Sequence, residues 1–111
     1  ITKSGTITME CAASGVPAVV FYKTSWPTYL IGRQIVSVKY LAMPNLLAGE
    51  AVYPEFVQDA ATAENISRAA LALWRDESRR AVVKAKLVEV VASLGGPGAA
   101  KRAAAAIVDL L

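Results

Sequence analysis

The chain contains no histidine among its 111 residues. Histidine is the commonest general base in enzymes and the commonest ligand of zinc. Its absence excludes Ser-His and Cys-His catalytic pairs within this chain. The single cysteine, Cys11, cannot form an internal disulfide, which agrees with a reducing compartment. No basic group stands next to Cys11, so we expect a small buried apolar residue there, and we predict neither a metal nor a cofactor.

Long apolar runs and a strong charge excess are also missing. No apolar run approaches the roughly 18 residues of a membrane span, and the N-terminus lacks the pattern of a signal peptide. A net charge of +3 is compatible with anionic substrates or lipid headgroups but falls short of the dense basic patches of nucleic-acid-binding proteins. With 55% hydrophobic residues, we expect a folded, soluble, cytoplasmic domain or part of one, without a nucleic-acid partner.

The first 22 residues predict a strand, a glycine loop, a helix and a second strand. Residues 1–2 are typical of a strand, and residues 4–6 place hydroxyl side chains on both sides of a glycine, where they can cap a helix over about 6–14. Gly15 would end this helix, and residues 18–21 would enter the next strand. Because the chain opens in mid-strand without an initiator methionine, we expect it to be a fragment of a longer protein.

The rest of the chain changes from mixed to helical character. We predict a helix over 25–36, a short strand over 38–43, a loop over 44–50 (PNLLAGE), a single helical turn over 53–58, and three helices over 62–75, 76–94 and 99–111. Thr62 and Asp76 are the expected N-caps, and the Gly-Gly-Pro-Gly at 95–98 ends the second of these helices.

Three of the predicted helices carry apolar faces with a helical period. In the helix over 62–75 the apolar face comprises Ile66, Ala69, Ala70, Leu73 and Trp74. In the helix over 76–94 it comprises Val83, Leu87, Val90, Val91 and Leu94, with Arg79, Arg80, Lys84 and Lys86 outward. In the helix over 99–111 it comprises Ala103, Ala104, Ile107, Val108 and Leu111. We expect two of these helices to cover the sheet and the last to pack by its alanine-rich face.

The helix over 25–36 presents a mixed face of Trp26, Tyr29, Leu30, Arg33 and Val36. Two interpretations remain open. The aromatic side chains pack against a neighbouring domain, or they lie with Lys39 and Tyr40 at a lipid headgroup interface. Aromatic residues at helical spacing belong more often to a core, which favours packing.

The glycine loop and the residues that follow it are candidates for binding a phosphorylated ligand. A helix N-terminus at the carboxyl end of a parallel strand favours an anion, so Ser4, Gly5 and Thr6 could hold a diphosphate. Glu10 follows one turn later on the same face, where it could accept hydrogen bonds from sugar hydroxyls. Ordinary helix capping and a solvated carboxylate are the alternatives.

Further polar candidates follow the second predicted strand. Lys23 could contact a phosphate, and the residues Asn45, Leu46, Leu47, Ala48 and Gly49 suggest a loop whose backbone approaches a ligand, with plain turn chemistry as the alternative. Glu55 and Gln58 could add polar contacts, although we expect them to form a charged surface.

Residues 3–58 resemble the C-terminal region of lipid-A-disaccharide synthase. The matching features are SGT-x3-E at 4–10, Gly-Val-Pro at 15–17, the Tyr-basic-x-Ser-x-x-Thr-Tyr stretch at 22–29, PNLLAG at 44–49 and PEF-x-Q at 54–58. The first two recur in other nucleotide-sugar transferases, whereas PNLLAG followed by PEF-x-Q is more specific to this family. The family usually has Arg-Glu after that glycine, where this chain has Glu50-Ala51.

The resemblance implies an α/β fold, the C-terminal half of a doubly wound, Rossmann-like domain that binds a nucleotide sugar in a metal-independent glycosyltransferase of the B fold. Residues 1–111 would form one partial domain with three C-terminal helices, and the acceptor domain with the catalytic base would lie outside this chain. Carried onto this sequence, Ser4, Gly5 and Thr6 would hold the diphosphate, Glu10 the ribose, and residues 45–49 would line the nucleotide pocket.

The implied reaction transfers 2,3-diacylglucosamine from UDP to 2,3-diacylglucosamine 1-phosphate and releases UDP, a step of lipid A and lipopolysaccharide biosynthesis. The implied partners are the UDP-linked donor, the lipid monosaccharide phosphate acceptor and the inner face of the bacterial inner membrane. Two alternatives remain: another UDP-sugar glycosyltransferase of this fold, and a non-catalytic helical interaction module. Half a sheet leaves an open edge, so we expect the isolated piece to form a homodimer, to swap elements or to aggregate.

Overall fold

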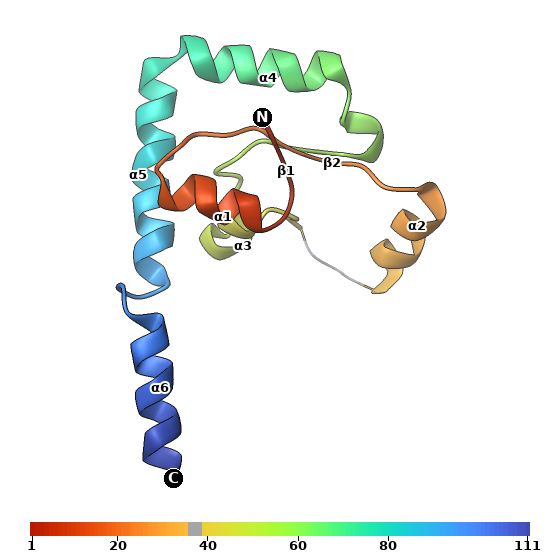
Figure 1. Cartoon of the computed structure of the whole chain (residues 1–111). Coiled ribbons are helices and arrows are strands. Elements are labelled where there is room, and N and C mark those ends of the chain that lie inside the picture. Colours follow the sequence, from red (N-terminus) through yellow and green to blue (C-terminus); the bar gives the residue numbers. More distant parts are fainter. Residues whose placement is uncertain (36–38) are drawn as a thin grey trace.

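The computed structural model describes residues 1–35 and 39–111 and shows a small parallel sheet with helices around it (Figure 1). In chain order the elements are β1 (Thr2–Lys3), α1 (Thr6–Ala13), β2 (Val20–Tyr22), α2 (Trp26–Ile35), α3 (Met43–Ala48), β3 (Glu55–Val57), the short 3-10 helix η1 (Gln58–Ala60), α4 (Ala63–Arg75), α5 (Glu77–Ser93) and α6 (Ala99–Leu110). The predicted α/β class is confirmed.

The three strands are parallel and lie in the order β1-β2-β3. Thr2 pairs with Val20, and Phe21 pairs with Phe56 in the next strand. The predicted strand-loop-helix-strand unit is confirmed, although β2 begins two residues later than expected. Because all three strands run in one direction, their carboxyl ends meet at one edge of the sheet.

The third strand is not where the sequence placed it. The strand expected over 38–43 is wrong for the described residues, because 39–42 form no strand and Met43 begins α3. The loop expected over 44–50 is mostly this helix, and the segment 53–58, expected to be a helical turn, contains β3 at its centre. Residues 36–38, which include the end of the predicted second helix and the start of that strand, lie outside the described residues. Pairing with the central strand β2 decides the conformation of 55–57, and local propensity does not reveal such a partner.

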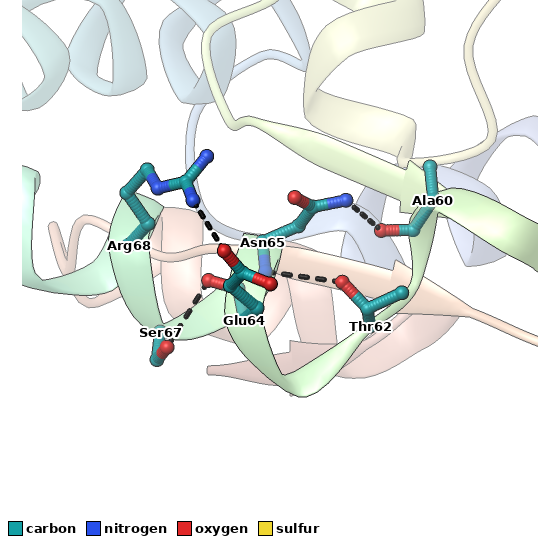
Figure 2. Close-up of polar contacts among 6 residues, drawn as sticks. All are labelled: Ala60, Thr62, Glu64, Asn65, Ser67 and Arg68. Carbon is teal, nitrogen blue, oxygen red and sulfur yellow. Dashed lines mark hydrogen bonds and ion pairs between the residues drawn. The ribbon is translucent and has the colours of Figure 1, made fainter.

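The three C-terminal helices agree with prediction to within about a residue. The Thr62 side chain accepts a hydrogen bond from the amide of Asn65 (3.1 Å), and Asp76 accepts one from the amide of Arg79 (2.9 Å). Figure 2 shows the start of α4, where Asn65 also donates to the carbonyl of Ala60 (3.0 Å) and an ion pair joins Glu64 to Arg68 (2.7 Å). These contacts are local, so short sequence patterns suffice to predict them.

The core lies between the sheet and helices α1, α3, α4 and α5. Its buried apolar side chains are Ala12, Ala18, Val19, Val20, Ala42, Val52, Tyr53, Leu73, Val83 and Leu87, and half-buried Cys11 packs against them. Helix α5 packs mainly on α1 and α3, and α4 packs on α5. The predicted inward faces are largely correct, but Trp74 and Leu94 are 79% and 53% exposed.

Helix α6 differs from the other C-terminal helices because none of its residues is buried. It continues beyond α5 away from the sheet (Figure 1). The expectation that its alanine-rich face packs is therefore not met within the described part of the chain. The Arg102 guanidinium donates to the carbonyls of Gly96 (3.0 Å) and Pro97 (2.8 Å) and so braces the turn between the two helices.

Candidate functional site

The carboxyl edge of the sheet brings together candidate residues from distant parts of the sequence. β1 leads directly into Ser4, and the neighbouring strand β2 leads into Lys23. β3 leads into Gln58. Ligands of open α/β sheets bind outside the carboxyl ends of the strands, so this edge is the candidate functional site.

The N-terminus of α1 lies at this edge and carries no side-chain cap. Gly5 is the N-cap residue at φ 134°, a conformation that favours glycine, and its carbonyl accepts from the Thr8 amide (3.1 Å) and hydroxyl (2.6 Å). The Ser4 hydroxyl donates instead to the carbonyl of Leu41 (3.4 Å). The interpretation of Ser4 and Thr6 as ordinary capping residues is therefore wrong, and the positive end of α1 faces the site without a side chain of its own.

Glu10 and Lys23 are both exposed to solvent. Glu10 lies one turn along α1 from Thr6, as the sequence predicted, and Lys23 is the first residue after β2. Both side chains are therefore accessible from solvent.

Asn45 has an internal partner for each end of its side chain. It is fully buried in α3, its amide nitrogen donates to the carbonyl of Tyr53 (2.7 Å), and its oxygen accepts from the Tyr53 amide (2.8 Å). Residues 46 and 47 are exposed, and Gly49 ends α3 in the left-handed conformation (φ 68°). The segment that the sequence indicated as a ligand loop is thus a short helix fixed to β3 by its asparagine.

Glu55 caps the start of α3 from a position more than ten residues later in the chain. Its carboxylate accepts from the amides of Leu41 (3.0 Å) and Ala42 (2.6 Å) and from the side chain of Asn45 (3.0 Å). The expectation of a charged surface residue is wrong here. The sequence holds no signal for this cap, because the donor amides precede the acceptor by 13 and 14 residues.

The side chain of Gln58 forms a pair of hydrogen bonds with the backbone of Thr24, as a neighbouring strand would. Its amide oxygen accepts from the Thr24 amide (2.7 Å) and its nitrogen donates to the Thr24 carbonyl (3.0 Å), so it imitates a strand residue. Gln58 is buried and has a positive φ of 54°, which is uncommon for a residue other than glycine. It fixes the segment after β2, and it too was wrongly expected at the surface.

Tyr53 connects α3 and β3 to the loop before β2. Its hydroxyl donates to the carbonyl of Val16 (2.7 Å), and its ring is fully buried. Burial raises the pKa of the Tyr53 phenol well above its ordinary value, and the nearby Cys11 raises it further. The phenol is therefore neutral and structural at physiological pH.

Two hollows lie beside α3. One of about 360 Å³ is lined by Lys39, Tyr40, Asn45, Ala51, Tyr53, Glu55, Val57 and Ala60. The other, of about 200 Å³, lies between α3 and α5, where Lys86 pairs with Glu50 at 2.8 Å. Glu50 stands where the resembling family usually has arginine, and here it joins α5 to the end of α3. Neither hollow is lined by residues 4–6 or Glu10.

The described residues hold no cluster of three or more side chains suited to a metal ion. None of the helices in the described ranges is long and apolar enough to cross a membrane.

Comparison with known proteins identifies the family. The family model described as Lipid-A-disaccharide synthetase matches residues 1–108. The chain is 40% identical over its whole length to the lipid-A-disaccharide synthase of Syntrophus aciditrophicus and 42% identical to that of Solibacter usitatus, and 41% identical over 86% of its length to that of Nitrosococcus oceani. It spans 29%, 29% and 24% of the length of these relatives. With a parallel α/β fold and a match over nearly every residue, the chain belongs to the lipid-A-disaccharide synthase family, glycosyltransferases of lipid A biosynthesis.

Proposed function

We propose that this chain is the donor-binding part of a glycosyltransferase of the B fold that binds a UDP-linked diacylglucosamine. The observation that carries the proposal is the N-terminus of α1, which lies at the carboxyl edge of the sheet without a side-chain cap. Membership of the family and the short span relative to its curated members support an assignment to one part of a larger enzyme.

The proposed reaction moves 2,3-diacylglucosamine from UDP to 2,3-diacylglucosamine 1-phosphate. The acceptor hydroxyl attacks the anomeric carbon, its proton goes to a base, and the bond to the diphosphate breaks so that UDP leaves. Negative charge then develops on the diphosphate, where backbone amides at the N-terminus of α1 stabilise it without a metal ion. The base stands on the opposite side of the sugar and belongs to a part of the enzyme other than this chain.

Each candidate residue has a proposed role in that scheme. Residues 4–6 hold the diphosphate, Lys23 adds a positive charge at the neighbouring strand end, and Glu10 accepts hydrogen bonds from the ribose hydroxyls. Residues 45–49 shape the nucleotide side of the pocket. Asn45 does so from within, because its hydrogen bonds to Tyr53 fix α3 against the strand that follows.

The substitution Glu10→Ala tests the proposal in the full-length protein that carries this sequence. Charge-assisted hydrogen bonds contribute about 1.5–3 kcal/mol each, so we expect the KM for the UDP donor to rise at least tenfold while the melting temperature hardly changes. Glu89→Ala, which removes another exposed helical glutamate on α5, is the matched control and should leave KM unchanged. An unchanged KM in folded Glu10→Ala would refute the ribose contact, and absence of saturable UDP binding in the wild type would refute the donor site.

A further inference from the structure

Thr8 is the most deeply buried residue of helix α1, although its side chain is polar. It is 0% exposed, and α1 packs on α3 and α5. A hydroxyl buried in this way needs a hydrogen-bond partner, because leaving it unpaired costs free energy. The Thr8 hydroxyl donates to the carbonyl of Gly5 at 2.6 Å, and the Thr8 amide donates to the same carbonyl at 3.1 Å. One residue thus supplies two donors to the carbonyl that precedes the helix.

The carbonyl of Gly5 belongs to the same peptide as the amide of Thr6, the first residue of α1. In a planar trans peptide the C=O and N–H groups point in opposite directions. Because the Gly5 carbonyl is held toward the helix by Thr8, the Thr6 amide points outward from the helix N-terminus. Rotation of this peptide by half a turn would instead direct a carbonyl oxygen outward, and that oxygen would repel an anion.

Packing around Gly5 does not prevent this rotation. Apart from its chain neighbours, no heavy atom of the described residues lies within 4 Å of the position that a Cβ would occupy on Gly5. Glycine also has the most freely rotating backbone of all residues. The two hydrogen bonds from Thr8 are therefore the restraint that the structure shows on this peptide, and the open space beside Gly5 lets a ligand approach the backbone.

The position of Thr8 separates its hydrogen bond from the common bond of a helical threonine. Threonines inside helices often donate to a carbonyl one turn earlier, and that carbonyl usually belongs to the same helix. Here the acceptor is the N-cap residue, which has no side chain with which to cap the helix itself. The β-branched side chain of Thr8 has few rotamers, so burial fixes the hydroxyl before any ligand arrives.

We propose that Thr8 is a positioning residue of the diphosphate site: its buried hydroxyl holds the Gly5 carbonyl toward α1 and thereby keeps the Thr6 amide directed at the ligand. The inference rests on the proposed function, which assigns the diphosphate to residues 4–6. It adds a residue that acts through the backbone without touching the ligand. A role of Thr8 in the packing of α1 alone is the competing outcome.

Titration calorimetry of the full-length protein that carries this sequence, with UDP and with inorganic pyrophosphate, tests the proposal. Thr8→Val removes the hydroxyl and keeps the shape of the side chain, whereas Thr8→Ser keeps the hydroxyl and removes a methyl group. The apparent Kd rises as the binding-competent fraction of the protein falls. Because one hydrogen bond corresponds to roughly a fivefold change in an equilibrium constant, we expect Thr8→Val to raise both Kd values about threefold or more. Thr8→Ser should change them less than about twofold.

Ser93→Ala is the matched control for loss of such a hydrogen bond. The Ser93 hydroxyl, at the end of α5, also donates at 2.6 Å to a carbonyl three residues earlier, that of Val90. This variant should leave both Kd values unchanged. If Thr8→Val does not fold, judged by its melting curve, Thr8→Ala is compared with Thr8→Ser, because these two differ only in the hydroxyl. Equal Kd values with and without the hydroxyl at position 8, or equal weakening in Ser93→Ala, would overturn the proposal.

The two ligands separate failure of this proposal from failure of the donor site. Pyrophosphate has no ribose, so Glu10→Ala should weaken UDP alone, whereas Thr8→Val should weaken both ligands. Wild-type binding of UDP that persists unchanged in Thr8→Val refutes only the positioning role. Absence of saturable UDP binding in the wild type refutes the donor site and the role of Thr8 with it. If pyrophosphate binds too weakly to titrate, the Kd of UDP decides alone.

Discussion

Residues 1–60 and residues 61–111 are stabilised by contacts of very different range. In the first region, side-chain hydrogen bonds join Tyr53 to Val16 and Gln58 to Thr24, which are 37 and 34 residues apart. In the second, the hydrogen bonds of the described side chains reach at most seven residues along the chain, as from Arg80 to Leu73. Side-chain hydrogen bonds in the α/β region thus join distant segments, whereas those in the helical region are local, and the helical region contacts the rest of the chain by the packing of α5 on α1 and α3 and by the Lys86–Glu50 ion pair.

The two asparagines, one in each region, test this difference most directly. Asn45→Ala removes a fully buried side chain and leaves the Tyr53 amide and carbonyl without partners, so we expect a loss of about 3 kcal/mol or more in the local free energy of unfolding. Asn65→Ala removes a local bond to the Ala60 carbonyl and should cost about 1 kcal/mol or less. Hydrogen exchange over residues 43–57 and 60–70 of the full-length protein measures both. Similar losses in the two regions would contradict the distinction.

Tyr53→Phe tests a long-range contact of the first region through its dependence on pH. Loss of the bond to Val16 should cost about 1 kcal/mol at neutral pH. Burial raises the pKa of the folded Tyr53 above the ordinary value of about 10. The neutral phenol therefore stabilises the fold fully below about pH 10, and this stability is lost as pH rises further, by about 1.4 kcal/mol per pH unit.

Urea unfolding of wild type and Tyr53→Phe between pH 8 and about 11 measures this effect as a difference, since ordinary alkaline effects on other groups cancel. The difference in free energy of unfolding between wild type and Tyr53→Phe should shrink and then reverse above pH 10. If the difference between the two proteins stayed constant over this pH range, Tyr53 would ionise without destabilising the fold, and its phenol would not be buried away from water.

Thr62→Ala tests the local region and should have a smaller effect. Loss of the bond from the Asn65 amide should destabilise the start of α4 by about 1 kcal/mol and leave hydrogen exchange in residues 43–57 unchanged.

Lys86→Ala should lower the free energy of unfolding even less, by about 0–1 kcal/mol, because the ion pair with Glu50 is partly exposed at both ends. Loss of protection in β3 on either change would mean that the two regions unfold together.

The same distinction explains which parts of the fold the sequence could predict. Thr62, Asp76 and the glycines at 95–98 act within a few residues, so the boundaries of α4 and α5 follow from short patterns. The predictions for the segments of β3 and α3 were wrong because their conformation depends on β2, Glu55 and Asn45, which come together only on folding. A strand of three residues has no periodicity of its own to detect.

The candidate site divides in a similar way. The glycine loop is a local motif, and it lies at the carboxyl edge of the sheet with Glu10 one turn further along α1, while the binding roles of these residues stay predictions. Glu55 and Gln58 were misjudged because a polar side chain that replaces backbone partners has the same sequence signature as a solvated one. Neither charge nor spacing distinguishes the two cases, since the amides they bind belong to segments 13 to 34 residues away.

The carboxylate of Glu55 has a mechanical consequence for the site. It belongs to β3 yet accepts from the amides of Leu41 and Ala42, and Leu41 in turn accepts from the hydroxyl of Ser4 beside the α1 N-terminus. A displacement of residues 41–42 therefore strains the hydrogen bonds that join these residues to β3. Residues 41–42 can therefore move away from β3 only if their hydrogen bonds to Glu55 break.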